Sequence, residues 1–256
     1  MYSMTKDLKL ACPACRYPAS WDQTEINIEF CFMHRKIILT GDGSHSLEIP
    51  GLHLTYHSTY GAIQESQHIF IDAGLHACIA SERSEAVRIF EVGFGTGLNA
   101  LLTLIASEKS EIKIHYEAVE LFPLDIQEVT VLNYCDQLRR DDLQPRFEQL
   151  HTCSWEREAM ITSNFILKKI RASIVAFIPS AGFDLIFFDA FDPKVQPELW
   201  TEEIFKKMFS MLCPGGILVT YSSKGSVRRA LQSAGFTVEK IAGPPGKKEI
   251  VRATRI

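Results

Sequence analysis

The sequence predicts an α/β fold: a mostly parallel, twisted sheet with helices on both faces, preceded by a small β-rich region. Three segments predict it. Residues 87–106 form a strand, a glycine turn and a helix in succession, and further strands are expected over residues 113–120 and 183–188. Helical stretches separate these strands, and strands that alternate with helices along a chain form parallel sheets covered on both faces.

The first elements are expected to form a β-hairpin. Strands over residues 36–40 and 46–49 flank a glycine-rich turn. The polar stretch that follows leads into a helical segment, and we expect it to form an accessory layer over the site described below. The chain therefore divides into a leader of residues 1–35, expected to be poorly ordered, an accessory region of residues 36–80 and a main domain of residues 81–256.

The turn after the strand at 87–92 contains Gly93, Gly95 and Gly97. Glycine has no Cβ, so the backbone can adopt positive φ and a ligand can lie against it, facing the amides of the helix that follows. The spacing is G-x-G-x-G, whereas dinucleotide-binding turns are spaced G-x-G-x-x-G. A tight turn without a ligand is the alternative, but three glycines in five residues favour a nucleotide-type cofactor site. Glu91 lies two residues before the first glycine.

Two acids end neighbouring strands. Glu120 ends the second strand, near the position about 20 residues beyond the glycine turn where an acid can accept both hydroxyls of a ribose. Asp189 directly follows the fourth strand. Because ligands bind beyond the carboxyl ends of strands in open α/β sheets, Asp189 is expected to point into the active-site crevice.

The remaining elements of the main domain are expected in chain order: a third strand over 165–170, a helix over 198–212, a turn at 214–216, a fifth strand over 217–221, a helix over 227–234, and two last strands that flank residues 243–248.

Composition limits the class of protein. With 256 residues, 46% of them hydrophobic and 23% charged, the chain suits one sizeable globular domain with a small addition. No apolar run approaches the roughly 18 residues of a membrane span, and the N-terminus lacks a secretory signal. We expect a soluble, cytoplasmic protein that contacts no membrane.

Seven scattered cysteines do not indicate a disulfide framework. Cys12 and Cys15, followed by Cys31 and His34, have the spacing of four zinc ligands, but nothing else in residues 1–36 resembles a zinc ribbon. We expect free thiols and no metal.

Charge is unevenly distributed. The chain carries a net charge of −4, yet residues 220–256 contain eight basic and two acidic side chains, a net +6, which leaves −10 for the remainder. A basic patch on an acidic body suits a polyanion that docks at one place, and an ordinary solvated face is the alternative.

The glycine turn resembles motif I of class I S-adenosylmethionine methyltransferases, where carboxylates lie near the cationic groups of the cofactor. Five segments in this order resemble the MnmC/MnmD family of tRNA methyltransferases over about residues 36–256: residues 93–99, 120–123, 189–193 with 197–200, 227–229 and 246–249. The resemblance implies a Rossmann-like fold, S-adenosyl-L-methionine as cofactor and tRNA, through its anticodon stem-loop, as partner.

The activity that this resemblance implies is N-methylation of the 5-aminomethyl group of wobble (2-thio)uridine, which gives 5-methylaminomethyl-2-thiouridine. Bifunctional members carry a flavin oxidoreductase domain, which we do not expect on this chain. Separate enzymes are expected to install the aminomethyl group.

The resemblance also implies site residues. Asp189 is expected to orient the acceptor amine and remove its proton, because a protonated amine has no lone pair with which to attack. Cofactor-binding candidates are Glu65, Glu91, Gly93, Gly95, Gly97, Asn99, Glu120 and Ser173. Ser173 follows the third strand, where many methyltransferases carry an acid that binds adenine. Candidates for tRNA binding are Phe191, which would stack on a base, and Lys224, Arg228, Arg229, Lys247 and Lys248, which would contact phosphates.

Three other functions are open at this point. A methyltransferase or aminopropyltransferase that acts on a small-molecule amine would share the same sheet. The glycine spacing disfavours a nicotinamide oxidoreductase, and a non-catalytic RNA-binding module would require a vestigial cofactor pocket.

Overall fold

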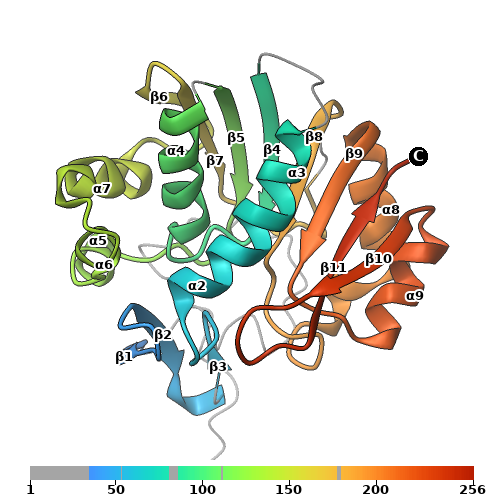
Figure 1. Cartoon of the computed structure of the whole chain (residues 1–256), viewed down its shortest axis with the longest axis horizontal. Helices are drawn as coiled ribbons and strands as arrows, with labels where there is room; N and C mark the ends of the chain where they lie inside the picture. The colour runs from blue at the N-terminus through green and yellow to red at the C-terminus, as the bar shows by residue number, and fades with distance from the viewer. Residues whose placement is uncertain (1–34, 53, 81–85, 111, 178–179) are drawn as a thin grey trace, which may run out of the picture. The chain divides into compact units, whose positions relative to one another are not determined.

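An eight-stranded sheet organises the described part of the chain in the computed structural model, with strand order β10-β11-β9-β8-β4-β5-β7-β6 (Figure 1). The structure describes residues 35–52, 54–80, 86–110, 112–177 and 180–256. The expected leader lies outside these residues except for Arg35, as do the four zinc-ligand candidates Cys12, Cys15, Cys31 and His34.

Five neighbouring strands run parallel: β4 (Ala86–Val92), β5 (Lys113–Val119), β7 (Phe165–Ile170), β8 (Phe183–Phe188) and β9 (Leu212–Thr220). Three antiparallel strands complete the two edges: β6 (Glu158–Thr162), β10 (Thr237–Ala242) and β11 (Glu249–Thr254). The predicted mostly parallel α/β fold is confirmed, and β6 is an additional strand that the sequence did not predict.

Alternating side chains of the strands face two separate hydrophobic cores. On β4, Ile89 packs in one core with the helix α4 (Leu98–Ser110), whereas Phe90 packs in the other with α8 (Glu202–Met211). Successive side chains of a strand point to opposite faces. The sheet is therefore buried on both sides, which explains why a central strand such as β8 is apolar at five of its six positions.

One continuous helical segment lies beside α4 on the first face, formed by α2 (Ala62–Ser66), the π-helical η2 (Gln67–His76) and α3 (Ala77–Ile79) (Figure 1). It packs against α4, β8 and β9. Residues within the expected accessory region thus cover the main sheet. The domain boundary at residue 80 stays a prediction.

Shorter elements fill the remaining described chain: η1 (Pro50–Leu52), α5 (Ile126–Val129), α6 (Tyr134–Gln137), η3 (Asp141–Leu143), α7 (Gln144–Thr152), η4 (Pro197–Trp200) and α9 (Gly225–Ser233). The predicted hairpin forms from β1 (Lys36–Leu39) and β2 (His45–Ile49), and β3 (Leu54–Thr55) extends it to three antiparallel strands. No helix in the described residues is long and apolar enough to cross a membrane.

Two expected boundaries differ from the structure. The helix expected over 198–212 is split at Thr201, which has extended φ and ψ and whose hydroxyl caps α8 by accepting a hydrogen bond from the amide of Ile204 at 3.3 Å. Residues 214–216 were expected to form a turn, but they lie inside β9. The amide of Gly215, at φ +77°, donates to the carbonyl of Arg255 and keeps this irregular stretch paired with the chain end.

Candidate active site

The glycine turn joins the carboxyl ends of three parallel strands. The amide of Gly93 donates to the carbonyl of Val119 at 3.0 Å, and the amide of Asp189 donates to the carbonyl of Val92 at 3.0 Å. Gly93 has φ +89°, and a Cβ on it would lie 2.7 Å from the carbonyl oxygen of Asp189. Only glycine therefore allows the turn to lie this close to Asp189.

Glu120 faces the glycine turn from the end of β5. Its Oε2 accepts a hydrogen bond from the amide of Gly95 at 3.0 Å, and its Oε1 accepts one from the amide of Phe122 at 2.8 Å. An ionised carboxylate has about four lone-pair positions. Glu120 can therefore still accept hydrogen bonds from a ligand.

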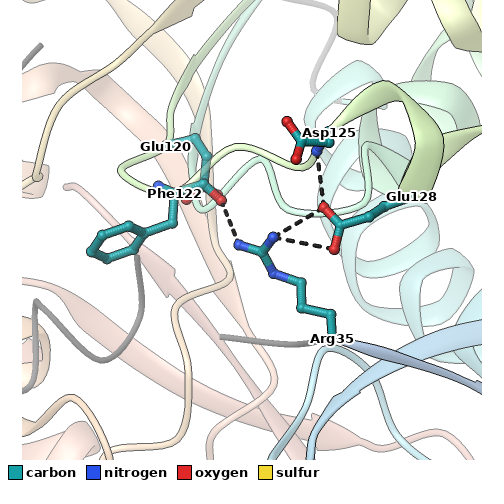
Figure 2. A network of polar contacts seen from close by, with 5 residues as sticks. All are labelled: Arg35, Glu120, Phe122, Asp125 and Glu128. Atoms are coloured by element: carbon teal, nitrogen blue, oxygen red, sulfur yellow. Dashed lines mark hydrogen bonds and ion pairs between the residues drawn. The ribbon is translucent and has the colours of Figure 1, made fainter. Parts of the chain in front are cut away.

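The loop after Glu120 is held by Arg35 (Figure 2). The Arg35 guanidinium donates to the carbonyl of Phe122 at 3.2 Å and pairs with Glu128 Oε2 at 3.0 Å. The same Glu128 oxygen accepts from the amide of Asp125, the N-cap of α5, at 2.9 Å. The Arg35 side chain is only 11% exposed. Arg35 thus ties the start of the accessory hairpin to the loop that positions Glu120.

We expect an Arg35→Met variant to lower the free energy of unfolding by about 2 kcal/mol, because it removes charged hydrogen bonds worth about 1.5–3 kcal/mol. Urea unfolding measures the change. Arg35→Lys keeps the charge but not the planar fork, so it is expected to recover only part of the loss. An unchanged urea midpoint in Arg35→Met would contradict this role.

Asn99 connects two acids at the centre of the site. Its side-chain amide donates to Glu91 Oε1 and to Asp189 Oδ2, each at 2.9 Å. Glu91 is fully buried, and burial raises the pKa of its carboxyl well above the usual range. Asn99 therefore orients Asp189, and the hydrogen bond to Glu91 holds the Asn99 side chain in place.

The pKa of Asp189 is also raised, to about 7: burial makes the largest contribution and the negative charge of Glu65 adds to it, while the hydrogen bond from Asn99 and the charge of Lys247 oppose the rise. A carboxyl with this pKa exchanges a proton near neutral pH. Perturbed carboxyl groups that line a crevice are candidates for general acid–base chemistry.

Three side chains from distant parts of the chain approach Asp189. Glu65 Oε1 pairs with the Nζ of Lys247 at 3.2 Å, and Glu65 Oε2 accepts from the amide of Ser58 at 2.7 Å. The Lys247 Nζ lies 4.8 Å from the centre of the Tyr221 ring. The Tyr221 hydroxyl donates to the carbonyl of Ala190 at 2.9 Å.

An aromatic pair lies beside the glycine turn. The rings of Tyr56 and Phe191 meet edge to face with their centres 5.2 Å apart, and a Cβ on Gly95 would lie 3.4 Å from the Tyr56 ring. Nearby, His57 is hydrogen-bonded to the hydroxyl of Ser46 at 3.2 Å, and burial lowers its pKa to about 4. His57 is therefore neutral and structural, whereas Phe191 lies next to the site.

The expected phosphate-binding residues fall into two groups. Lys224 and Lys247 are held in ion pairs, Lys224 with Asp192 at 2.6 Å. Arg229 and Lys248 are exposed, and Arg228 is half-buried with its Nε donating to the carbonyl of Ser223 at 3.3 Å. Ser173 lies just beyond the end of β7, where its hydroxyl accepts from the amide of Val175 at 3.3 Å.

Arg35 and Tyr221 were not predicted as functional residues. Arg35 acts on a loop more than 80 positions away, and no local pattern indicates such a contact. Tyr221 is the last residue of an expected buried strand, and only its position beyond Thr220 brings its ring to the site. In the described residues, no group of three or more His, Cys, Asp or Glu side chains is arranged to hold a metal ion.

Several known proteins are similar to this chain in sequence. A family model for S-adenosyl-L-methionine-dependent methyltransferases matches residues 138–256. The tRNA 5-methylaminomethyl-2-thiouridine biosynthesis bifunctional protein MnmC of Ectopseudomonas mendocina is 29% identical over 211 residues, which cover 77% of this chain and 31% of that protein. Its namesake in Stutzerimonas stutzeri is 30% identical over 207 residues, with the same coverage of 77% and 31%. The chain spans about a third of the length of these curated relatives.

A solved structure shares the fold. The crystal structure of MnmC2 from Aquifex aeolicus superposes with a TM-score of 0.69 at 27% sequence identity, and the match covers 86% of this chain and 70% of that one.

Proposed function

We propose that this S-adenosyl-L-methionine-dependent methyltransferase methylates the 5-aminomethyl group of the wobble uridine of tRNA, which gives 5-methylaminomethyl-2-thiouridine where the base is thiolated. The methyltransferase assignment comes from its family match and its relatives. The observation that carries the choice of an amine acceptor is Asp189, a carboxyl with a pKa of about 7 at a strand end beside the glycine turn. The relatives named for this modification support tRNA as the substrate.

The cofactor is S-adenosyl-L-methionine, which supplies an electrophilic methyl group. The residues present fit it. Gly93, Gly95 and Gly97 all have positive φ, so the turn offers backbone without side chains. Glu120 keeps acceptor capacity for ribose hydroxyls, and the carboxyl of Glu65 can accept a hydrogen bond from the amino group of the cofactor. We assign these residues, together with Glu91, Asn99 and Ser173, to the cofactor site.

The acceptor amine must lose a proton before it can react. Alkylammonium groups release their proton only at basic pH, so the site must accept that proton near pH 7. We assign this step to Asp189: the N–H bond of the ammonium breaks, the electron pair stays on nitrogen, and the proton moves to a carboxyl oxygen. Asn99 keeps this carboxyl in place.

We expect the rate of the wild-type enzyme to fall below about pH 7. The pKa of Asp189 is raised to about 7, so the carboxyl is ionised and able to accept a proton only above that pH. A pH profile of kcat/KM is expected to rise through a midpoint near 7. A flat profile between pH 5.5 and 8 would contradict the assignment of Asp189.

We assign the RNA contacts to Phe191 and to the basic side chains Lys224, Arg228, Arg229 and Lys248. Basic side chains position a phosphate backbone without reading its sequence, so binding is expected to weaken steeply with salt. We further propose that the protein acts in the cytoplasm, on tRNA to which separate enzymes have added the aminomethyl group. It needs no flavin for this step, because methyl transfer to an amine neither oxidises nor reduces the acceptor.

The proposal is tested by incubating the protein with methyl-labelled S-adenosylmethionine and tRNA that lacks the final methyl group, followed by digestion to nucleosides. The label is expected in 5-methylaminomethyl-2-thiouridine, or in 5-methylaminomethyluridine where the base is not thiolated, and in no other nucleoside. The same tRNA with an unmodified wobble uridine is the control and is expected to stay unlabelled. Label in another nucleoside, or transfer only to free small-molecule amines, would refute the proposed substrate.

A further inference from the structure

Lys247 lies inside the site, although the basic tail that contains it suggests a phosphate contact. Its Nζ is 3.2 Å from Glu65 Oε1 and 4.8 Å from the centre of the Tyr221 ring. The side chain of Lys247 is 28% exposed and that of Glu65 is 11% exposed. An ammonium between a carboxylate and an aromatic face is already neutralised, so it is poorly available to RNA phosphates.

The loop between β10 and β11 fixes Lys247 in this place. The amide of Lys247 donates to the carbonyl of Pro244 at 2.9 Å, and the amide of Gly243 donates to the carbonyl of Lys248 at 3.1 Å. Gly246, at φ +86°, lies directly against the ring of Tyr60 in the accessory region, where a Cβ would not fit. The turn thus packs on the accessory region and directs Lys247 inward, while Lys248 is exposed.

Charges around Asp189 come from several elements. Glu65 on α2 and Lys247 form an ion pair beside it, and they act on the pKa of the Asp189 carboxyl in opposite directions. Tyr221 beyond β9, Tyr116 on β5 and Glu91 on β4 also face it, and burial raises the pKa of all three, which favours their neutral forms. Asn99 on α4 donates a hydrogen bond.

These charges determine the electrostatic environment of an amine bound beside Asp189. With Lys247 in place, the set of Glu65, Asp189 and Lys247 has a net charge of −1, so one ammonium neutralises it. Without Lys247 the net charge would be −2, and a carboxylate pair would hold the amine as a protonated salt. The lysine cancels Glu65 and leaves Asp189 as the one group that takes the proton.

We propose that Lys247 is a positioning residue that neutralises Glu65 and thereby sets the charge of the Asp189 site, and that it does not contact RNA phosphate. This inference deepens the proposed function and rests on it for the role of Asp189. The charge balance itself is a property of the protein without substrate, so it can be measured separately.

The test follows the titration of Asp189 by NMR in the full chain with ¹³C-labelled aspartate carboxyl groups, assigned with Asp189→Asn. Lys247→Met is expected to raise the titration midpoint by about one pH unit, because an opposite charge nearby is removed. Glu65→Gln is expected to lower it, because a like charge is removed. The double variant is expected to return the midpoint close to that of the wild type, and Lys247→Arg is expected to leave it nearly unchanged.

Kinetics supply a second readout that a phosphate contact would not produce. Lys247→Met is expected to move the acid limb of the kcat/KM profile upward, whereas Lys248→Met is expected to raise the KM for tRNA without moving that limb. An Asp189 midpoint that stays in place in folded Lys247→Met overturns the inference, whatever the acceptor. If the wild-type protein does not methylate tRNA while the variants show the expected NMR shifts, the proposed function is refuted and the charge balance stands.

Discussion

An Asp189→Asn variant is expected to lose about 10²- to 10⁴-fold in kcat, the range typical of general-base removal, while binding S-adenosylmethionine within about threefold of the wild type. Asparagine has nearly the same shape and its carbonyl oxygen can still accept the hydrogen bond from Asn99, but it cannot take a proton. The dependence of the remaining rate on pH near 7 is expected to disappear.

Methyl transfer to tRNA at saturating cofactor measures the loss, and calorimetry measures cofactor binding. Asp136→Asn, the same change at an exposed position on α6, is the matched control and is expected to behave as the wild type. Full activity of Asp189→Asn would refute the base assignment. A loss of cofactor binding equal to the loss of rate would show that Asp189 acts on the cofactor instead.

Gly93→Ala is also expected to lower the rate of methyl transfer strongly, because it displaces the backbone beside Asp189. The new Cβ would lie 2.7 Å from the carbonyl oxygen of Asp189, and a positive φ costs a non-glycine residue about 1–2 kcal/mol. The backbone of Asp189 must therefore move. Since a displacement of about 1 Å can cost 10²-fold in rate, we expect about that loss in kcat/KM together with weaker cofactor binding.

Gly51→Ala provides the comparison, because a Cβ there would meet nothing within 4 Å and Gly51 lacks a positive φ. Its urea midpoint and kcat/KM are expected to match those of the wild type. If Gly93→Ala binds cofactor and turns over normally, the close approach of the turn to Asp189 has no functional role.

The parallel part of the sheet could be predicted because burial on both faces leaves a simple pattern. The run at residues 183–188 is apolar at five of its six positions and is followed directly by Asp189, and the strand at 87–92 is followed directly by Gly93. The edge strand β6 carries no such pattern, since four of its five residues are at least partly exposed. Its pairing with β7 comes from tertiary contacts that a local pattern does not contain.

The candidate site also contains residues that the sequence predicts and residues that it does not. That Glu120, Asp189 and the three glycines lie together could be predicted because strand ends in a parallel sheet meet at one edge. The role of Lys247 could not, because the sequence shows only a basic tail, and its inward direction depends on Gly246 packing against Tyr60. The contacts of Arg35 could not be predicted for a similar reason, because its partners Phe122 and Glu128 are distant in the sequence and come close to it only in the folded chain.

The raised pKa of Asp189 has a consequence for the fold itself. The unfolded chain releases this proton near the ordinary value of 3.8, whereas the folded protein retains it up to about 7. The folded state therefore binds more protons over that interval, and this group makes the free energy of unfolding fall as the pH rises from about 4 to about 7. Above about pH 7 the Asp189 carboxyl is ionised, so it can accept a proton but the folded state is less stable. A bound cation is expected to restore part of that stability.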